Sequence, residues 1–295
     1  MRQLYSEIEK QRKKENFEWL NSNYDAYVWF LIQSIVNRKD VSDLQNEFSI
    51  PKSLKTIKSI AEHIYDNADN AQYVDTIINY INKKNKLDNL NQIVTQLKET
   101  KLFNWGGDFQ GSLEKSLIKK YIKNNNSISE SIDIITNETI NYLYASKYNY
   151  LSSKLTENIF FKHPTVTPTI NKIKSVDFFI GESFWDLKQT ILPKAFIDKK
   201  DFKTAINEVE QNPYELIKWL YENQGEMRFG SENRIFVIFV DKSNYAESWK
   251  LKSNLKLLES SINKFLDKKP PSIDVTFTFK GTNYKTKSKL ILISK

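Results

Sequence analysis

The run Arg234–Val240, RIFVIFV, is the feature that most constrains the fold of this chain. Its apolar residues are continuous over the length of a strand, without the alternation of a strand that has one wet face. Such a run is typical of a central strand that is covered on both sides. The run therefore predicts a sheet lying inside a layered protein.

The spacing of apolar side chains predicts helices on both sides of this strand in the sequence. We expect 1–103 to be helical, and the break Trp105-Gly106-Gly107-Asp108 marks a change of organisation. The sequence is therefore divided into a helical N-terminal region over 1–108 and a mixed region over 109–295. In the second region, helices are predicted at about 112–123, 129–161, 201–223 (split or kinked by Pro213) and 246–266.

Strands are predicted at 175–180, 183–190, 273–280 and 289–293, in addition to the apolar run. The order of elements from the long helix onward is helix, strand, strand, helix, strand, helix, strand, strand. This order predicts a mixed α/β fold, with a small central sheet and helices on both faces.

The first two strands form a hairpin that carries the most informative side chains. Gly181-Glu182 is a two-residue loop with Gly first, which suits a type II′ turn. That turn places Asp177 directly across from Asp186, and alternation puts Lys188 on the same face and Gln189 on the other. Because like charges that face each other on a sheet repel, we interpret the two carboxylates as a site for a divalent cation.

The composition limits which side chains could act in an active site. The chain has no cysteine and two histidines, His63 and His163, which excludes disulfide scaffolds, cysteine-based zinc sites and cysteine nucleophiles. Carboxylates, lysines and hard cations remain, and oxygen ligands suit Mg²⁺. No apolar run is long enough to span a bilayer and the first residues do not resemble a signal peptide, so we expect no membrane segment and a cytoplasmic location.

The net charge of +8 fits two interpretations, a lysine-rich solvated surface or a surface that binds phosphates. The charge alone does not choose between them.

An acidic residue on one strand, followed by Asp-x-Lys on the next, resembles the PD-(D/E)xK nuclease superfamily, and within it the type II restriction endonucleases. The resemblance covers roughly 109–295 and is sharpest over 176–196, with Val176 where the family often has proline. It implies a restriction-endonuclease-like core, a small mixed sheet flanked by helices. The family motif maps onto Asp177, Asp186 and Lys188.

The same triplet also occurs at Asp198-Lys199-Lys200, Asp201-Phe202-Lys203 and Asp267-Lys268-Lys269, in predicted loops or helix ends. These three are expected to be ordinary solvated charges. The Asp186 triplet differs because it lies in an apolar strand, faces a second carboxylate and precedes a buried strand.

The resemblance implies that Asp177 and Asp186 bind one or two Mg²⁺ ions, with the main-chain carbonyl of Leu187 as a further ligand. Lys188 would hold or deprotonate the attacking water, or stabilise the phosphate. Family members often add a carboxylate from the preceding helix, for which Glu157 and Glu114 are the two candidates, and Glu157 is preferred because its helix leads into the hairpin.

The stretch 115–123 offers a surface for a DNA backbone or, equally, a solvated helix face, through Lys115, Lys119, Lys120 and Lys123. The resemblance implies a Mg²⁺-dependent, sequence-specific endonuclease that cuts double-stranded DNA at a short palindromic site in a restriction–modification system. A two-fold site suits a homodimer, in which the helical region over 1–108 would serve dimerisation or surround the DNA.

Two other functions remain open. One is a nuclease with the same core but another role, such as nicking, repair or mobilisation of an element. The other is a non-catalytic DNA-binding protein that works through its helical half.

Overall fold

The computed structural model describes residues 2–100, 128–198, 201–223 and 230–295. The N-terminal region is helical in its described part, as predicted. Its helices are α1 (Arg2–Lys13), α2 (Phe17–Asn21), α3 (Tyr24–Ile35), α4 (Val41–Glu47), α5 (Ile57–Asn67), α6 (Ala71–Lys84) and α7 (Leu90–Glu99).

Asparagine-rich connections between these helices serve as caps. The side chain of Asn70 accepts a hydrogen bond of 2.9 Å from the backbone N–H of Tyr73 at the start of α6, and Asn89 caps α7 in the same way. Asparagine suits this position because its oxygen satisfies one of the N–H groups that a helix start leaves unpaired.

The remaining elements form a mixed α/β arrangement, which confirms the predicted fold class at that level. The helical elements are α9 (Ile128–Lys162), α10 (Lys194–Ile197), α11 (Phe202–Gln211), α12 (Tyr214–Glu222), η3 (Tyr245–Ser253) and α13 (Leu255–Lys268). The strands are β1 (Val166–Ile173), β2 (Val176–Ile180), β3 (Ser183–Ile191), β4 (Arg234–Val240), β5 (Ile273–Phe279) and β6 (Thr282–Ser294).

The sheet has six strands in the order β1-β2-β3-β4-β6-β5. The pairs β3–β4 and β4–β6 are parallel, and the other three pairs are antiparallel. Strand β4 is central and buried along its whole length, as its sequence predicts.

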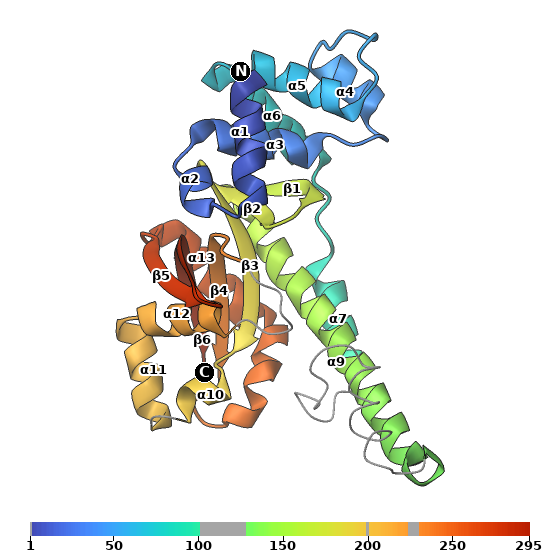
Figure 1. Cartoon of the computed structure of the whole chain (residues 1–295). Coiled ribbons are helices and arrows are strands. Elements are labelled where there is room, and N and C mark those ends of the chain that lie inside the picture. Colours follow the sequence, from blue (N-terminus) through green and yellow to red (C-terminus); the bar gives the residue numbers. More distant parts are fainter. Residues whose placement is uncertain (1, 101–127, 199–200, 224–229) are drawn as a thin grey trace.

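Helices cover both faces of this sheet (Figure 1). Along β4, Ile235, Val237 and Phe239 pack in one hydrophobic cluster with α9 and α13. The alternate residues Phe236 and Ile238 pack in another with α11 and α12. The period of two in a strand therefore divides one continuous apolar run between two cores.

The N-terminal helices share a core with the first strands of the sheet. Buried residues from α1 to α6 form one cluster with Val176, Phe179 and Phe184 of the β2–β3 hairpin. The rings of Phe30 and Phe184 meet edge to face, with their centroids 4.8 Å apart. In Figure 1 these helices lie at the top of the molecule next to β1 and β2, whereas the first part of α9 extends beyond the sheet toward the lower right. The predicted boundary at residue 108 lies outside the described residues.

The structure adds detail to the prediction at three places. Strand β1 is not among the predicted strands, because Pro168 and its polar neighbours obscure the strand pattern. The single helix predicted at 246–266 is two elements, η3 and α13, and Asn254 between them caps α13. The predicted helix at 201–223 is split at Pro213 into α11 and α12, as expected.

Among the described residues, no helix is both long and apolar enough to cross a membrane.

Candidate active site

The β2–β3 hairpin has the predicted register. Phe178 pairs with Trp185, Phe179 with Phe184 and Ile180 with Ser183, around the Gly181-Glu182 loop. Gly181 has a φ of +57°, whereas Glu182 is not among the residues with positive φ, as expected for a type II′ turn.

The ladder between β2 and β3 ends one pair before the two aspartates, and the strands separate there. From Asp186 onward β3 pairs with β4, beginning with a hydrogen bond of 2.9 Å from the N–H of Asp186 to the carbonyl of Asn233. We call the gap that opens between β2 and β3 at Asp177 and Leu187 the fork.

Asp177 fills the fork with its side chain. Its Oδ2 accepts a hydrogen bond of 2.7 Å from the N–H of Leu187, so that a carboxylate replaces the missing strand partner. Because the N–H and C=O of a strand residue point to the same edge, the carbonyl of Leu187 faces the fork as well. Burial, and then the negative charge of Asp186, raise the pKa of Asp177.

Asp186 is buried and held by two cations. Its Oδ1 accepts from Lys188 Nζ at 3.0 Å, and its Oδ2 accepts from Arg234 Nε at 3.0 Å. The two cations differ in their surroundings, because the side chain of Lys188 is 51% exposed and that of Arg234 is 8% exposed. Asp186 therefore has one buried and one solvent-accessible partner.

Arg234 belongs to a buried network at the start of β4. Its Nη2 donates to Glu232 Oε2 at 2.9 Å, and its guanidinium carbon lies 5.2 Å from the centroid of the Tyr221 ring. Glu232 also accepts a bond of 2.6 Å from Ser175 Oγ. Gly230 has no room for a side chain here, since a Cβ would lie 1.9 Å from Glu232 Oε2.

The third carboxylate comes from α9. Burial raises the pKa of Glu157 to about 7, and the negative charge of Asp177 is the largest of the charge effects that act on it. The structure thus brings Glu157 to the fork, whereas the rival candidate Glu114 lies outside the described residues.

Gln189 fixes α9 against β3 from the face opposite Lys188, as alternation predicts. Its Nε2 donates to Ser152 Oγ at 2.9 Å and Ser153 Oγ at 3.0 Å, and its Oε1 accepts from Thr156 Oγ1 at 3.0 Å. These bonds hold the turn of α9 that immediately precedes Glu157.

A cavity of about 580 Å³ lies beside the fork, between α9, β1 and the start of β2, and both Glu157 and Asp177 line it. Three lysines also line it. Lys154 pairs with Asp88 at 3.0 Å and Lys174 with Glu15 at 3.5 Å. Lys172 forms no ion pair with any described residue, and its positive charge lowers the pKa of both Glu157 and Asp177.

The carboxylates suit a hard cation in part. The charge of Asp177 adds to the burial that raises the pKa of Glu157, a cost that a divalent ion would reduce, and the Leu187 carbonyl faces the fork as well. Both oxygens of Asp186 are occupied by cationic side chains. In the part of the chain that the structure describes, no three carboxylate or histidine side chains are grouped closely enough to form a ready metal site.

In two of the other Asp-x-Lys triplets the aspartate has a structural role. Asp201 caps α11 by accepting from the N–H of Thr204 at 3.1 Å. Asp267, in the last turn of α13, lies 3.1 Å from His163 Nε2. The four lysines predicted to contact DNA, Lys115, Lys119, Lys120 and Lys123, lie outside the described residues.

Arg234 and Glu232 are site residues that the sequence does not predict. Both precede or begin the apolar run, where the only signal is a charged pair next to a strand that must be buried. Their position beside Asp186 depends on the parallel register of β3 and β4, in which Asp186 is aligned with Arg234.

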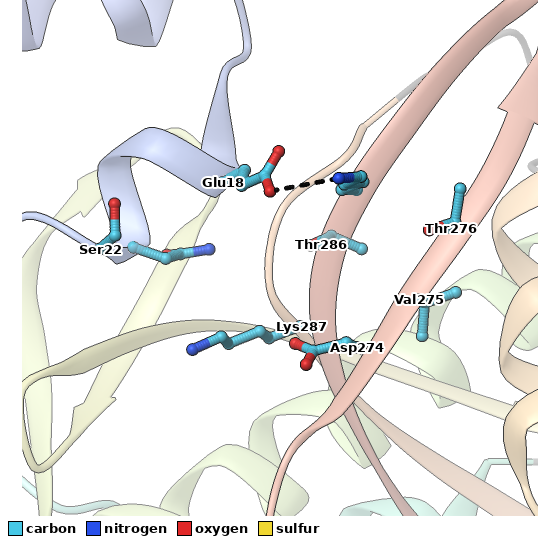
Figure 2. Close-up of a pocket in the computed structure, with 9 residues that line it drawn as sticks. Glu18, Ser22, Asp274, Val275, Thr276, Thr286 and Lys287 are labelled. Atoms are coloured by element: carbon cyan, nitrogen blue, oxygen red, sulfur yellow. Dashed lines mark ion pairs between the residues drawn. The ribbon is translucent and has the colours of Figure 1, made fainter.

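A second cavity, of about 380 Å³, lies between α2 and the β5–β6 hairpin (Figure 2). Glu18 and Lys285 form an ion pair of 3.7 Å across it, and Asp274 lies opposite Lys287 in the strand ladder. Each of these charges therefore faces a charge of opposite sign, whereas at the fork the charge of Asp177 acts unfavourably on Glu157. Asn233 connects the two places, because its Oδ1 accepts from Asn21 Nδ2 at 2.5 Å and its carbonyl from Asp186.

Comparisons of the chain with protein-family models, with curated proteins and with solved structures found no match.

Proposed function

We propose that this protein is a Mg²⁺-dependent endonuclease that hydrolyses phosphodiester bonds of double-stranded DNA. The observation that supports this most directly is the fork, where Asp177 of β2 binds the Leu187 N–H next to the Asp186–Lys188 pair of β3, and Glu157 of α9 lines the same cavity as Asp177. The restriction-endonuclease-like core, the restriction role, a short palindromic site and a homodimer are parts of the same proposal and rest on the resemblance of the motif.

Each side chain has a role in this proposal. Asp177, Glu157, Asp186 and the Leu187 carbonyl are the oxygens that would hold the cation. When bound, Mg²⁺ would supply a polarised phosphate oxygen and a bound water of lowered pKa. Lys188 would position the attacking water or the phosphate.

The cavity beside the fork supports a phosphate-bearing substrate. Lys172 lines it without an ion pair to any described residue, and an ammonium attracts phosphate as a point charge. We therefore expect Lys172 to contact a phosphate next to the cleaved bond, and its replacement to weaken DNA binding more than the chemical step.

The experiment incubates the purified protein with phage DNA and Mg²⁺. Discrete fragments, lost in EDTA and in the variants Asp186→Asn and Lys188→Ala, are the expected result. The matched controls Asp201→Asn and Lys203→Ala make the same changes in the triplet that caps α11, and they should cleave normally.

Other outcomes would select another function. A nicked product or random degradation, instead of discrete fragments, would indicate a nuclease with a different role. DNA binding that falls steeply with salt, but ignores metal and Asp177→Asn, would indicate a non-catalytic DNA-binding protein. Absence of cleavage with any divalent metal on varied DNA would count against an enzyme. Light scattering after size exclusion would test the homodimer.

A further inference from the structure

We infer that Arg234 is a positioning residue that keeps Oδ2 of Asp186 out of the metal site, and that a divalent cation enters by displacing Lys188 from Oδ1. This inference rests on the proposed function. It assigns Asp186 a single ligand oxygen, and it gives Lys188 two successive partners.

The contact between Arg234 and Asp186 is buried and supported by further contacts of Arg234. Its Nε donates to Asp186 Oδ2 at 3.0 Å, while its Nη2 donates to Glu232 at 2.9 Å. The Tyr221 ring lies against its guanidinium, and Ser175 holds Glu232 in turn. Moving this buried guanidinium away from Asp186 would also disturb its bond to Glu232, and breaking buried ion pairs is costly, so Arg234 is expected to stay in place.

In the contact between Lys188 and Asp186, by contrast, the lysine is accessible to solvent. Its side chain is 51% exposed, and its bond to Asp186 Oδ1 joins residues only two apart on the same strand. Asp186 is buried, but the half-exposed side chain of Lys188 can be solvated by water once it leaves, which lowers the cost of breaking this pair. Lys188 is therefore the partner that a cation can replace.

The exchange has a consequence for the chemistry. Asp186 cannot offer both oxygens to a cation while Arg234 occupies Oδ2, so it binds through Oδ1 alone. The ammonium of Lys188 is released at the moment that the cation arrives. It then becomes available to the water or phosphate at the fork, so that the group expected to act on substrate is held by Asp186 until the metal is bound.

Calorimetric titration of the DNA-free protein with Mn²⁺ tests the exchange without any measurement of activity. Lys188→Met removes the competing ammonium and should tighten Mn²⁺ binding by roughly twofold to fivefold. The matched control is Lys242→Met, which removes an ion pair of 2.7 Å with Glu210 at the other end of β4, from a lysine that is 44% exposed. Lys242→Met should leave Mn²⁺ affinity unchanged.

Nuclear magnetic resonance tests the part played by Arg234. Its Nε–H, identified by loss of the signal in Arg234→Lys, should exchange slowly with solvent both before and after Mg²⁺ is added. The exchange of Lys188 Nζ protons should change when Mg²⁺ binds.

Two results would overturn the inference while leaving the proposed function intact. In the first, the unaltered protein cleaves DNA, but Lys188→Met binds Mn²⁺ no more tightly than the unaltered protein does. The other is loss of protection at Arg234 Nε–H when Mg²⁺ binds. Failure of the unaltered protein both to bind Mn²⁺ and to cleave DNA would overturn the inference and the proposed function together.

Discussion

Glu157 is the residue whose surroundings most directly set the pH behaviour of this protein. Its pKa is raised from about 4.5 to about 7 because its anion is buried beside Asp177. Between these two pH values the folded state keeps a proton that the unfolded state has lost. Stability therefore falls as the pH rises from about 4.5 through about 7, and the cost stays in place above that range.

Glu157→Gln removes this cost. In EDTA, we expect the variant to unfold with a free energy larger by on the order of 1 to 3 kcal/mol at pH about 8, and to differ little at pH about 5. Urea unfolding at the two pH values measures the effect. Glu99→Gln, at an exposed glutamate of α7, is the control. An equal gain at both pH values would show that the raised pKa of Glu157 is not the cause.

Gly230 shows how closely the network around Arg234 is packed. A Cβ at this position would lie 1.9 Å from Glu232 Oε2 and 2.5 Å from Arg234 Nη2, so Gly230→Ala must displace the ion pair. We expect a loss of about 1 to 3 kcal/mol in the free energy of unfolding. The loss should be smaller when Glu232 is also alanine, and a double-mutant cycle by urea unfolding measures that coupling.

At the residue scale, local rules predict part of the site and miss the rest. Asp177, Asp186 and Lys188 can be placed together because a two-residue loop and a period of two act within one hairpin. Arg234 and Glu232 cannot, because they reach Asp186 only through the pairing of β3 with β4. That pairing joins residues 48 positions apart in the chain.

At the scale of elements, the contact between α9 and β3 decides where Glu157 lies. Gln189 forms three hydrogen bonds to α9, and Gln189→Ala leaves those hydroxyls without their amide partner. We expect a loss of about 1 to 3 kcal/mol in stability, with faster hydrogen exchange in α9 around Ser152–Thr156. Gln211→Ala, at the exposed end of α11, is the control. Unchanged exchange in α9 would show that other contacts hold it.

Strands β1 and β4 mark the limits of prediction from sequence at this scale. The predicted ends of β4 are the observed ones, because an uninterrupted apolar run has clear ends. Strand β1 is an edge strand with an irregular register between Pro168 and Ile173. Proline and polar residues are tolerated at an edge, where one side of the strand has no partner, so the pattern that identifies a strand is absent.

At the scale of the whole molecule, the N-terminal helices and the β2–β3 hairpin depend on one another. Phe30 and Phe17 contact Phe184, and Tyr27 contacts Phe179, in a shared cluster. The predicted division at residue 108 follows a change in sequence character, whereas this cluster joins the two sides. Sequence patterns report the period within a segment, but not which distant segment covers its apolar face.

A fragment of residues 128–295 therefore exposes the aromatic face of the hairpin. We expect it to bind a hydrophobic dye and to unfold without a sharp transition, whereas the whole chain unfolds cooperatively. Circular dichroism during thermal unfolding, with dye fluorescence, measures this. A fragment that unfolds as sharply as the whole chain would show that the mixed region folds alone.

The fork makes one backbone amide a reporter of the whole site. The N–H of Leu187 donates to a carboxylate, and a carboxylate that takes up a proton or a cation becomes a weaker acceptor. The proton chemical shift of this single amide would therefore follow protonation, metal entry and substrate arrival in turn. The protein carries this signal in its own backbone, so its site can be followed without an attached label.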